Sequence, residues 1–238
     1  MKNQGQGVAP QALEQDSESV RDFISMAVHD LREPLRGIRL GVQLLTGKER
    51  EPSKENIERG ARYLLDGADR METLIHDIAE FCYEEVREPN FTETDLEMVW
   101  LEAKNELAVE LRTSGATLAC DPLPSVIGNS AALGTVFRAL ISNACKFRGE
   151  KALHIHIGAA QEGSEVILSV QDNGTGFNPA YQERIFRPFE RLSGKQYPGS
   201  GLGLTLAKKI VGQHGGKIWA ESKPGEGATI RFSLPLAV

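Results

Sequence analysis

The sequence predicts an α+β protein in which a helical hairpin is followed by an α/β sandwich, a single sheet with helices on one face. Three observations support this fold class. Apolar residues recur at steps of three and four from Val20 to Leu45 and again from Ile57 to Cys82, which indicates two long amphipathic helices. From Asp95 onward the apolar segments are shorter, and helical and strand periodicities alternate. The chain therefore divides into a part with two long helices and a part with shorter helices and strands.

The first helix is expected to run from about Leu13 to Thr46, with Gly47 at its C-terminal end. At about 100° per residue, His29 lies nearly opposite the centre of the apolar stripe. We therefore expect His29 to face solvent. Pro34 lies inside the helix, where it removes a backbone donor and should bend the helix one turn after His29.

The second helix follows a charged turn at 48–53, in which Ser53 is a candidate N-cap. Its apolar positions alternate steps of four and three without a break, as in a coiled-coil seam. A hairpin with one stripe on each helix buries both stripes best by pairing with a second copy into a four-helix bundle, so the pattern predicts a homodimer. Packing onto the C-terminal part is the alternative. Pro89 and Asn90 close the unit.

The second part should contain three helices and six strands. The helices are expected at 96–111, 130–147 and 202–212, and the strands at 116–119, 125–127, 153–157, 166–170, 217–221 and 228–234. We therefore expect a flexible N-terminus at 1–12, the hairpin domain at 13–90 and the sandwich domain at 91–238.

Composition narrows the classes of function. A net charge of −6 and a pI near 5.5 argue against nucleic acid or an anionic membrane as partner. No apolar run approaches the ~18 residues of a membrane span, and residues 1–12 lack the apolar core of a signal peptide. The three cysteines are far apart and have no metal-type spacing, which favours reduced thiols in the cytoplasm.

Two glycine-rich loops are candidate phosphate sites. Residues 171–177 follow an expected strand, and residues 198–204 open an expected helix. Glycines let backbone N–H groups approach phosphate oxygens, and a helix N-terminus adds a favourable field. The second loop is neither a Walker loop nor a dinucleotide fingerprint, and alone it is equally compatible with a plain turn.

Asn143 and Lys146 are three residues apart near the end of an expected helix, so they share a face. A neutral oxygen ligand and a cation could therefore reach one site, as a magnesium–phosphate group requires. Alone, the pattern favours a solvated helix end, because lysine is favourable there anyway.

Five segments together resemble, in order and spacing, the five sequence boxes of sensor histidine kinases. They are His-Asp-Leu-Arg-Glu-Pro-Leu at 29–35, Asn-x-x-Lys-Phe at 143–147, Asp-x-Gly-x-Gly at 172–176, Ile-Phe-Arg-Pro-Phe-Glu-Arg at 185–191 and Gly-Ser-Gly-Leu-Gly-Leu at 199–204. Residues 215–222 and 225–235 match the closing hairpin of that family. The resemblance covers nearly the whole chain from about residue 18. The motif residues are most similar to those of the branch found in bacteriophytochromes and related soluble kinases.

The resemblance implies a dimerisation and phosphotransfer domain followed by an ATP-binding domain of the Bergerat type. Such a protein autophosphorylates a histidine, here His29, from ATP and Mg²⁺, and transfers the phosphoryl group to an aspartate of a separate response regulator. Asp30 would tune His29, and Arg191 would reach the γ-phosphate. A sensor domain or protein upstream, outside this chain, is also implied.

The resemblance also assigns the nucleotide site. Asp172 would accept a hydrogen bond from the adenine amino group, Asn143 would hold Mg²⁺ and Lys146 would meet phosphates. The full implied set is Asn143, Lys146, Phe147, Asp172, Gly174, Gly176, Gly199, Ser200, Gly201, Leu202 and Gly203.

Two positions depart from the family pattern. Ala139 stands four residues before Asn143, where the family often has an asparagine. The related ATP-hydrolysing chaperones and gyrases carry a glutamate there that activates water, so a simple ATPase is disfavoured. Glu33 stands four residues after His29, where many members that also dephosphorylate their partner carry Thr or Asn, so we expect weak or no phosphatase activity. A Bergerat ATPase or serine kinase, and a silent dimeric scaffold, are the competing hypotheses.

The remaining histidines favour structural roles. His154 and His156 share one strand face without a third ligand, which is typical of exposed strand residues. His76 is expected on the hairpin surface and His214 at a helix end. Phe186 and Phe189 are compatible either with the core or with a lid.

Overall fold

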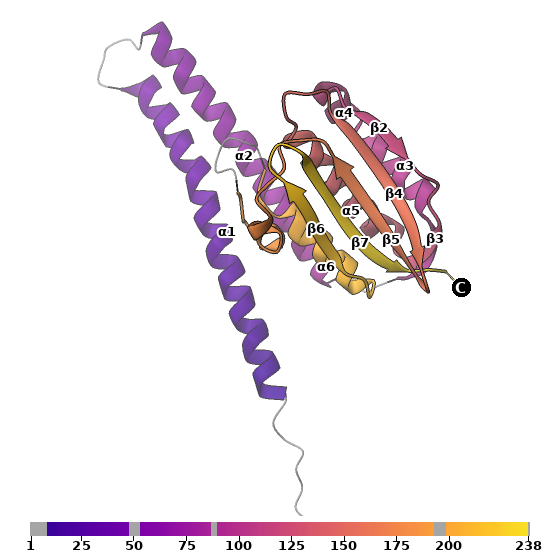
Figure 1. Ribbon diagram of the computed structural model, residues 1–238. Coiled ribbons are helices and arrows are strands. Elements are labelled where there is room, and N and C mark those ends of the chain that lie inside the picture. Colours follow the sequence, from indigo (N-terminus) through magenta and orange to yellow (C-terminus); the bar gives the residue numbers. More distant parts are fainter. Residues whose placement is uncertain (1–8, 48–52, 87–89, 193–198, 238) are drawn as a thin grey trace, which may run out of the picture. The chain divides into compact units, whose positions relative to one another are not determined.

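A computed structural model describes residues 9–47, 53–86, 90–192 and 199–237. By its contacts the chain divides into two compact units, residues 1–78 and 79–238, and each is described by itself. The first unit is a helical hairpin, and the second is a sheet with helices on one face (Figure 1). The boundary that the sequence predicts, between residues 90 and 91, stays a prediction.

The hairpin consists of α1 (Ala9–Thr46) and α2 (Lys54–Val86). The first helix begins before the predicted Leu13 and continues without interruption through Pro34. The predicted N-cap is confirmed, because the Oγ of Ser53 accepts a hydrogen bond from the backbone N of Asn56 at 3.2 Å. Residues 48–52 of the turn predicted at 48–53, and residues 1–8 of the flexible N-terminus predicted at 1–12, lie outside the described residues.

Glycines let the two helices approach closely. A Cβ on Gly67 would lie 2.6 Å from Cγ1 of Ile38 and 3.0 Å from the carbonyl oxygen of Pro34. A Cβ on Gly41 would lie 2.7 Å from the carbonyl oxygen of Gly60. Because no other residue fits these gaps without displacing the opposite helix, the glycines determine the spacing of the hairpin.

Much of the predicted apolar stripe is exposed within one chain. Ala27 of the predicted stripe on α1 is buried, and so is Leu74, which lies outside the predicted seam on α2. By contrast, Ile57 and Ile75 of that seam are 46% and 54% exposed. Apolar residues of the predicted stripe on α1 are exposed as well, namely Val20, Ile24, Leu35 and Val42. The hairpin alone thus leaves an apolar surface of the kind that marks an interaction site.

The second unit is built on a five-stranded sheet in the order β2–β4–β5–β7–β6. Its strands are β2 (Thr117–Cys120), β4 (His154–Glu162), β5 (Glu165–Asp172), β6 (Ile218–Lys223) and β7 (Gly227–Pro235). Strands β2 and β4 pair in parallel, and the other pairs are antiparallel. A separate antiparallel pair joins β1 (Thr92–Asp95) to β3 (Ser125–Gly128).

Helices cover one face of this sheet (Figure 1). They are α3 (Leu96–Glu106), α4 (Ala108–Ser114), α5 (Ser130–Lys146) and α6 (Gly203–Gln213). The core between the layers includes the fully buried Phe137 of α5, Ile210 of α6 and Phe232 of β7. Two short 3₁₀ turns, η1 (Pro179–Tyr181) and η2 (Arg184–Phe186), lie between β5 and α6.

The fold class predicted from the sequence is confirmed, and three details differ. The single helix predicted at 96–111 is two helices, because the chain leaves helical conformation at Leu107 before α4 begins. Strand β1 was not predicted, since its residues are polar and only Thr94 is buried. The turns η1 and η2 were not predicted either.

Candidate active site

His29 projects from α1 into solvent, and its side chain is 83% exposed. Its Nδ1 lies 3.0 Å from Oδ1 of Asp30, whose side chain is 23% exposed. A carboxylate can only accept a hydrogen bond, so Nδ1 carries the proton, and in the neutral ring Nε2 keeps its lone pair. The hairpin thus presents one free nucleophilic nitrogen.

Asp172 ends β5 in the second unit, and its Oδ1 accepts two backbone hydrogen bonds. The donors are the N–H of Gly174 at 2.8 Å and that of Ala228 on β7 at 3.3 Å. Burial raises the pKa of the Asp172 carboxyl above its ordinary value, although both hydrogen bonds act to lower it. Among the described residues, Oδ2 has no hydrogen-bond partner, so it can accept from a ligand.

The loop after Asp172 is clamped between α5 and the turn joining β6 to β7. The carbonyl oxygen of Phe147 accepts from the N–H of Thr175 at 2.8 Å and from its Oγ1 at 3.2 Å. A Cβ on Gly174 would collide with that same carbonyl oxygen. Gly176 has a φ of 59°, and a Cβ there would collide with the carbonyl oxygen of Lys223. Both glycines are therefore required by the path of the loop.

Lys146 and the second glycine loop lie close together. A Cβ placed on Gly199, which has a φ of 133°, would be 3.2 Å from Nζ of Lys146. Asn143, one turn earlier on the same face of α5, is half-buried. That Asn143, Lys146 and this loop form one nucleotide site stays a prediction.

The start of α6 offers backbone donors. Ser200 is buried, and its Oγ accepts from the N–H of Leu202 at 3.0 Å. Leu202 is the N-cap residue and supplies no side-chain acceptor, so the first N–H groups of α6, from Gly203 on, have no intrahelical partner. Such a helix start favours an anion. Gly201 has a φ of 81°, which shapes the loop just before it.

The donor set fits a magnesium–phosphate group. The amide oxygen of Asn143 is the kind of single protein ligand that Mg²⁺ accepts when phosphates and waters complete its shell. A Cβ on Gly203 would lie 3.7 Å from Cβ of Ala139. At that position, one turn before Asn143, α5 therefore presents a methyl group and no carboxylate. No cluster of three or more metal-ligating side chains occurs in the described part of the chain.

Arg191 is half-buried and directly follows the segment anchored by the buried Ile185 and Phe186. It forms no ion pair with a carboxylate of the described residues. Residue 198, the first of the second glycine-rich loop, lies outside the described residues.

Sequence reasoning missed three side chains that hold the site together. The Oγ of Ser222 accepts from the N–H of Phe177 at 2.8 Å and donates to the carbonyl oxygen of Gly227 at 2.7 Å. Asn173 bonds the backbone of Ala152 and His154, both at 2.8 Å. Thr175 is the third. Asn173 alone had a signal, since asparagine before glycine favours a turn.

The other histidines have structural surroundings. The exposed His154 and His156 contact Thr117 and Asp121, respectively. His214 ends α6, as predicted, but it is buried and its Nε2 accepts from the N–H of Asn129 at 3.0 Å. Phe186 belongs to the core. None of the described helices combines the length and apolar character that crossing a membrane requires.

Two domain families match the chain. Residues 19–81 match the His Kinase A (phospho-acceptor) domain, and residues 128–238 match the histidine kinase-, DNA gyrase B- and HSP90-like ATPase. The first match contains His29. The second contains Asn143, Asp172 and both glycine loops.

Curated relatives and a solved structure match this chain over most of its length. The chain is 37% identical over 225 residues to cyanobacterial phytochrome A of Nostoc sp., a match that covers 94% of this chain and 29% of the phytochrome. It is 29% identical over 226 residues to the sensor-like histidine kinase SenX3 of Mycobacterium bovis, covering 92% of this chain and 54% of SenX3. The fold resembles that of histidine kinase ThkA in complex with response regulator protein TrrA, with a TM-score of 0.73, 20% identity, and 94% and 64% of the two chains covered. The chain therefore spans about a third to a half of the curated relatives it matches.

Proposed function

We propose that this chain, which belongs to the sensor histidine kinases as their catalytic core, uses ATP to phosphorylate its own His29 and then passes the phosphoryl group to an aspartate of a separate response-regulator receiver domain. The observation that carries the proposal is the exposed imidazole of His29, whose Nδ1 is held by Asp30 while Nε2 is free.

The chemical step follows from that geometry. Nε2 attacks the γ-phosphorus of ATP, so an N–P bond forms, the P–O bond to ADP breaks and ADP leaves. Positive charge develops on the ring, and the Asp30 carboxylate next to Nδ1–H offsets it. Mg²⁺, when bound, supplies charge neutralisation at the phosphates, and Asn143 would hold it. Arg191 would contact the γ-phosphate. The product is a phosphoramidate, which an aspartate carboxylate can attack in turn.

The second unit would bind the nucleotide. The free Oδ2 of Asp172 suits the adenine amino group, and the open N–H groups at the start of α6 suit phosphates. Lys146, lying against the Gly199 loop, adds a cation. Phe147, Gly174, Gly176, Ser200, Gly201, Leu202 and Gly203 would shape the pocket. Ala139 disfavours a simple ATPase, because that position presents no carboxylate to activate water.

We further propose the assembly and context of the chain. The exposed stripes of α1 and α2 would be buried by a second copy, in a homodimer. Consumption of ATP and the free thiols of Cys82, Cys120 and Cys145 fit the cytoplasm. An upstream sensor would supply the signal. Domain limits of 1–12, 13–90 and 91–238 are proposed from the sequence.

Glu33 leads to a further proposal about dephosphorylation of the response regulator. It places a carboxylate one helical turn after His29, on the same face, where a side chain that positions a hydrolytic water would be needed. We therefore propose little phosphatase activity toward a phosphorylated receiver domain. A time course of acyl phosphate on such a domain, with and without this chain, tests it, and rapid loss that depends on Glu33 would contradict it.

The kinase proposal is tested by incubation with γ-labelled ATP and Mg²⁺. Wild type should acquire label that is labile in acid and stable in base, as a phosphoramidate is. His29→Ala should acquire none, whereas His76→Ala, an exposed histidine on the same hairpin, should be labelled like wild type. Acid-stable label would favour a hydroxyl kinase, free phosphate alone would favour an ATPase, and nucleotide binding without turnover would favour a scaffold.

A further inference from the structure

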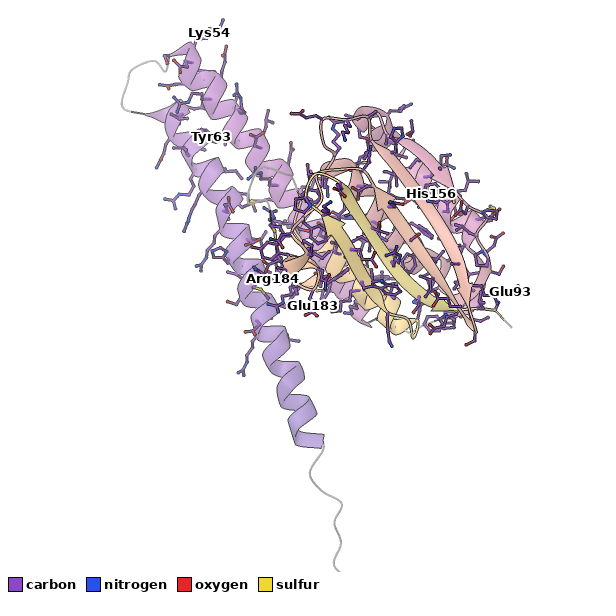
Figure 2. The ribbon with its side chains drawn as sticks, in the orientation of Figure 1. Lys54, Tyr63, Glu93, His156, Glu183 and Arg184 are labelled. Atoms are coloured by element: carbon purple, nitrogen blue, oxygen red, sulfur yellow. The ribbon has the colours of Figure 1, made fainter. Side chains whose placement is uncertain are left out.

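The segment that precedes Arg191 is braced by a second arginine. Arg184, labelled in Figure 2, begins η2, and its Nη2 lies 2.5 Å from Oε1 of Glu190. Its guanidinium also lies over the ring of Tyr181, with Cζ 4.9 Å from the ring centroid. One side chain therefore links the turn before η2 to the residue just before Arg191.

The backbone between the two ends of this brace is in an unusual conformation. Phe189 has a φ of 59°, which bulky residues seldom adopt and which persists only when the surroundings enforce it. On one side, Ile185 and Phe186 are buried in the core. On the other side, the ion pair of Glu190 holds the chain directly after Phe189. The brace thus helps to enforce a strained turn whose next residue is Arg191.

The same turn packs on the second glycine loop. A Cβ on Gly201 would lie 3.0 Å from Cα of Phe189 and 3.1 Å from the carbonyl oxygen of Glu190. Only glycine permits this approach, at a φ of 81°. The position of the Arg191 backbone is therefore linked to that of the loop proposed to hold the phosphates.

We propose that Arg184 is a positioning residue for phosphoryl transfer, which through Glu190 orients Arg191 toward the γ-phosphate; this inference rests on the function proposed above. The side chains of Arg184 and Glu190 are 44% and 24% exposed. An ion pair exposed to that degree contributes little to stability, so its principal effect is on the direction of the chain. A small displacement of a group that contacts the transferring phosphoryl is costly in rate.

The test compares Arg184→Ala with Arg187→Ala. Arg187 is an exposed arginine of the same segment that forms no ion pair within the described part of the chain, so it is the matched control. At saturating ATP, Arg184→Ala should lower the rate of His29 phosphorylation about tenfold. Its dissociation constant for a non-hydrolysable ATP analogue should stay within about twofold of wild type. Arg187→Ala should match wild type in both.

A double-mutant cycle shows whether Arg184 acts through Arg191. In an Arg191→Ala background, Arg184→Ala should cause no further loss of rate, and Arg184→Glu combined with Glu190→Arg should recover most of the wild-type rate. The inference would be overturned if Arg184→Ala caused equal losses of rate in both backgrounds. It would also be overturned if neither Arg184→Ala nor Glu190→Gln changed the rate, or if both of these variants failed to fold. Absence of phosphorylation in wild type would instead overturn the proposed function.

Discussion

Asp172 is fixed by the N–H groups of Gly174 and Ala228, and the burial that accompanies this arrangement raises the pKa of its carboxyl. In the proposed function, Oδ2 of the charged carboxylate accepts a hydrogen bond from the adenine amino group, because both oxygens of a carboxylate are acceptors. Burial penalises that charge, so the folded, unliganded protein is less stable with Asp172 ionised than it would be with a neutral group there. The proposed function and stability therefore oppose one another at this residue.

The first prediction concerns Asp172→Asn. Because the pKa of Asp172 is higher in the folded than in the unfolded state, its contribution to stability is present at low pH and is lost as pH rises through the folded pKa. At pH 7 the variant should therefore have a higher free energy of unfolding than wild type, and the difference should shrink toward about pH 4. Urea denaturation across this range measures it. A variant less stable than wild type at pH 7 would contradict this prediction. The variant should also lose nucleotide binding.

Asp30→Asn tests the partner of His29. The amide keeps the shape of the carboxylate but carries no charge to offset the developing imidazolium, so the rate of autophosphorylation should fall about 10- to 100-fold. Nucleotide affinity should not change, because Asp30 belongs to the hairpin and the nucleotide is proposed to bind to the second unit. Asp22→Asn, an exposed acid on the same helix, is the control. Equal rates for both variants would refute the role of Asp30.

Residues of the candidate site could be predicted from the sequence where the chemistry lies in one contiguous motif. His29 with Asp30, and Asp172 with its two glycines, are of this kind. Thr175 and Ser222 could not be found, because they bond the backbone groups of Phe147 and Phe177, which lie 28 and 45 residues away in the sequence. The pairing of Arg184 with Glu190 likewise depends on a turn whose path the sequence pattern does not display.

At the level of elements, hydrophobic periodicity predicted the long helices and most strands, because each buries one face. It failed for β1, whose polar residues pair with β3 through the backbone. It also failed at Leu107, where the apolar spacing continues while the helix breaks. The glycines of the hairpin had no sequence signal, since glycine inside a helix ordinarily only weakens it.

Two glycines of the hairpin should therefore respond oppositely to alanine. Gly67→Ala inserts a methyl group 2.6 Å from Ile38, so it should lower the free energy of unfolding by about 1–3 kcal/mol. For Gly37→Ala the nearest neighbour is 3.8 Å away, so the better helix propensity should raise it by about 0.5–1 kcal/mol. Chemical denaturation of both variants measures the pair. Similar effects in both would contradict the close packing.

At the scale of the whole molecule, the apolar residues left exposed on α1 and α2 favour burial against a second copy. Ile75 lies on the predicted seam of α2 and is 54% exposed in one chain. The sequence predicted this surface from the unbroken seam, but a single chain cannot display what covers it.

Ile75→Asp should disrupt the dimer, because it would bury an unpaired charge. The dimer dissociation constant should rise at least about 100-fold in analytical ultracentrifugation. Leu65→Asp, an exposed leucine of α2 outside the seam, should change it little. A wild-type chain that remains monomeric at micromolar concentration, or equal effects of both variants, would contradict the assembly.

Of the five histidines of the chain, we propose that one, His29, receives the phosphoryl group of ATP. Mass spectrometry at neutral to basic pH, after incubation of wild type with ATP and Mg²⁺, locates the phosphate. It should lie on His29 and on no other histidine. Phosphate on His76, His154, His156 or His214, on a hydroxyl side chain, or on no residue at all would contradict it.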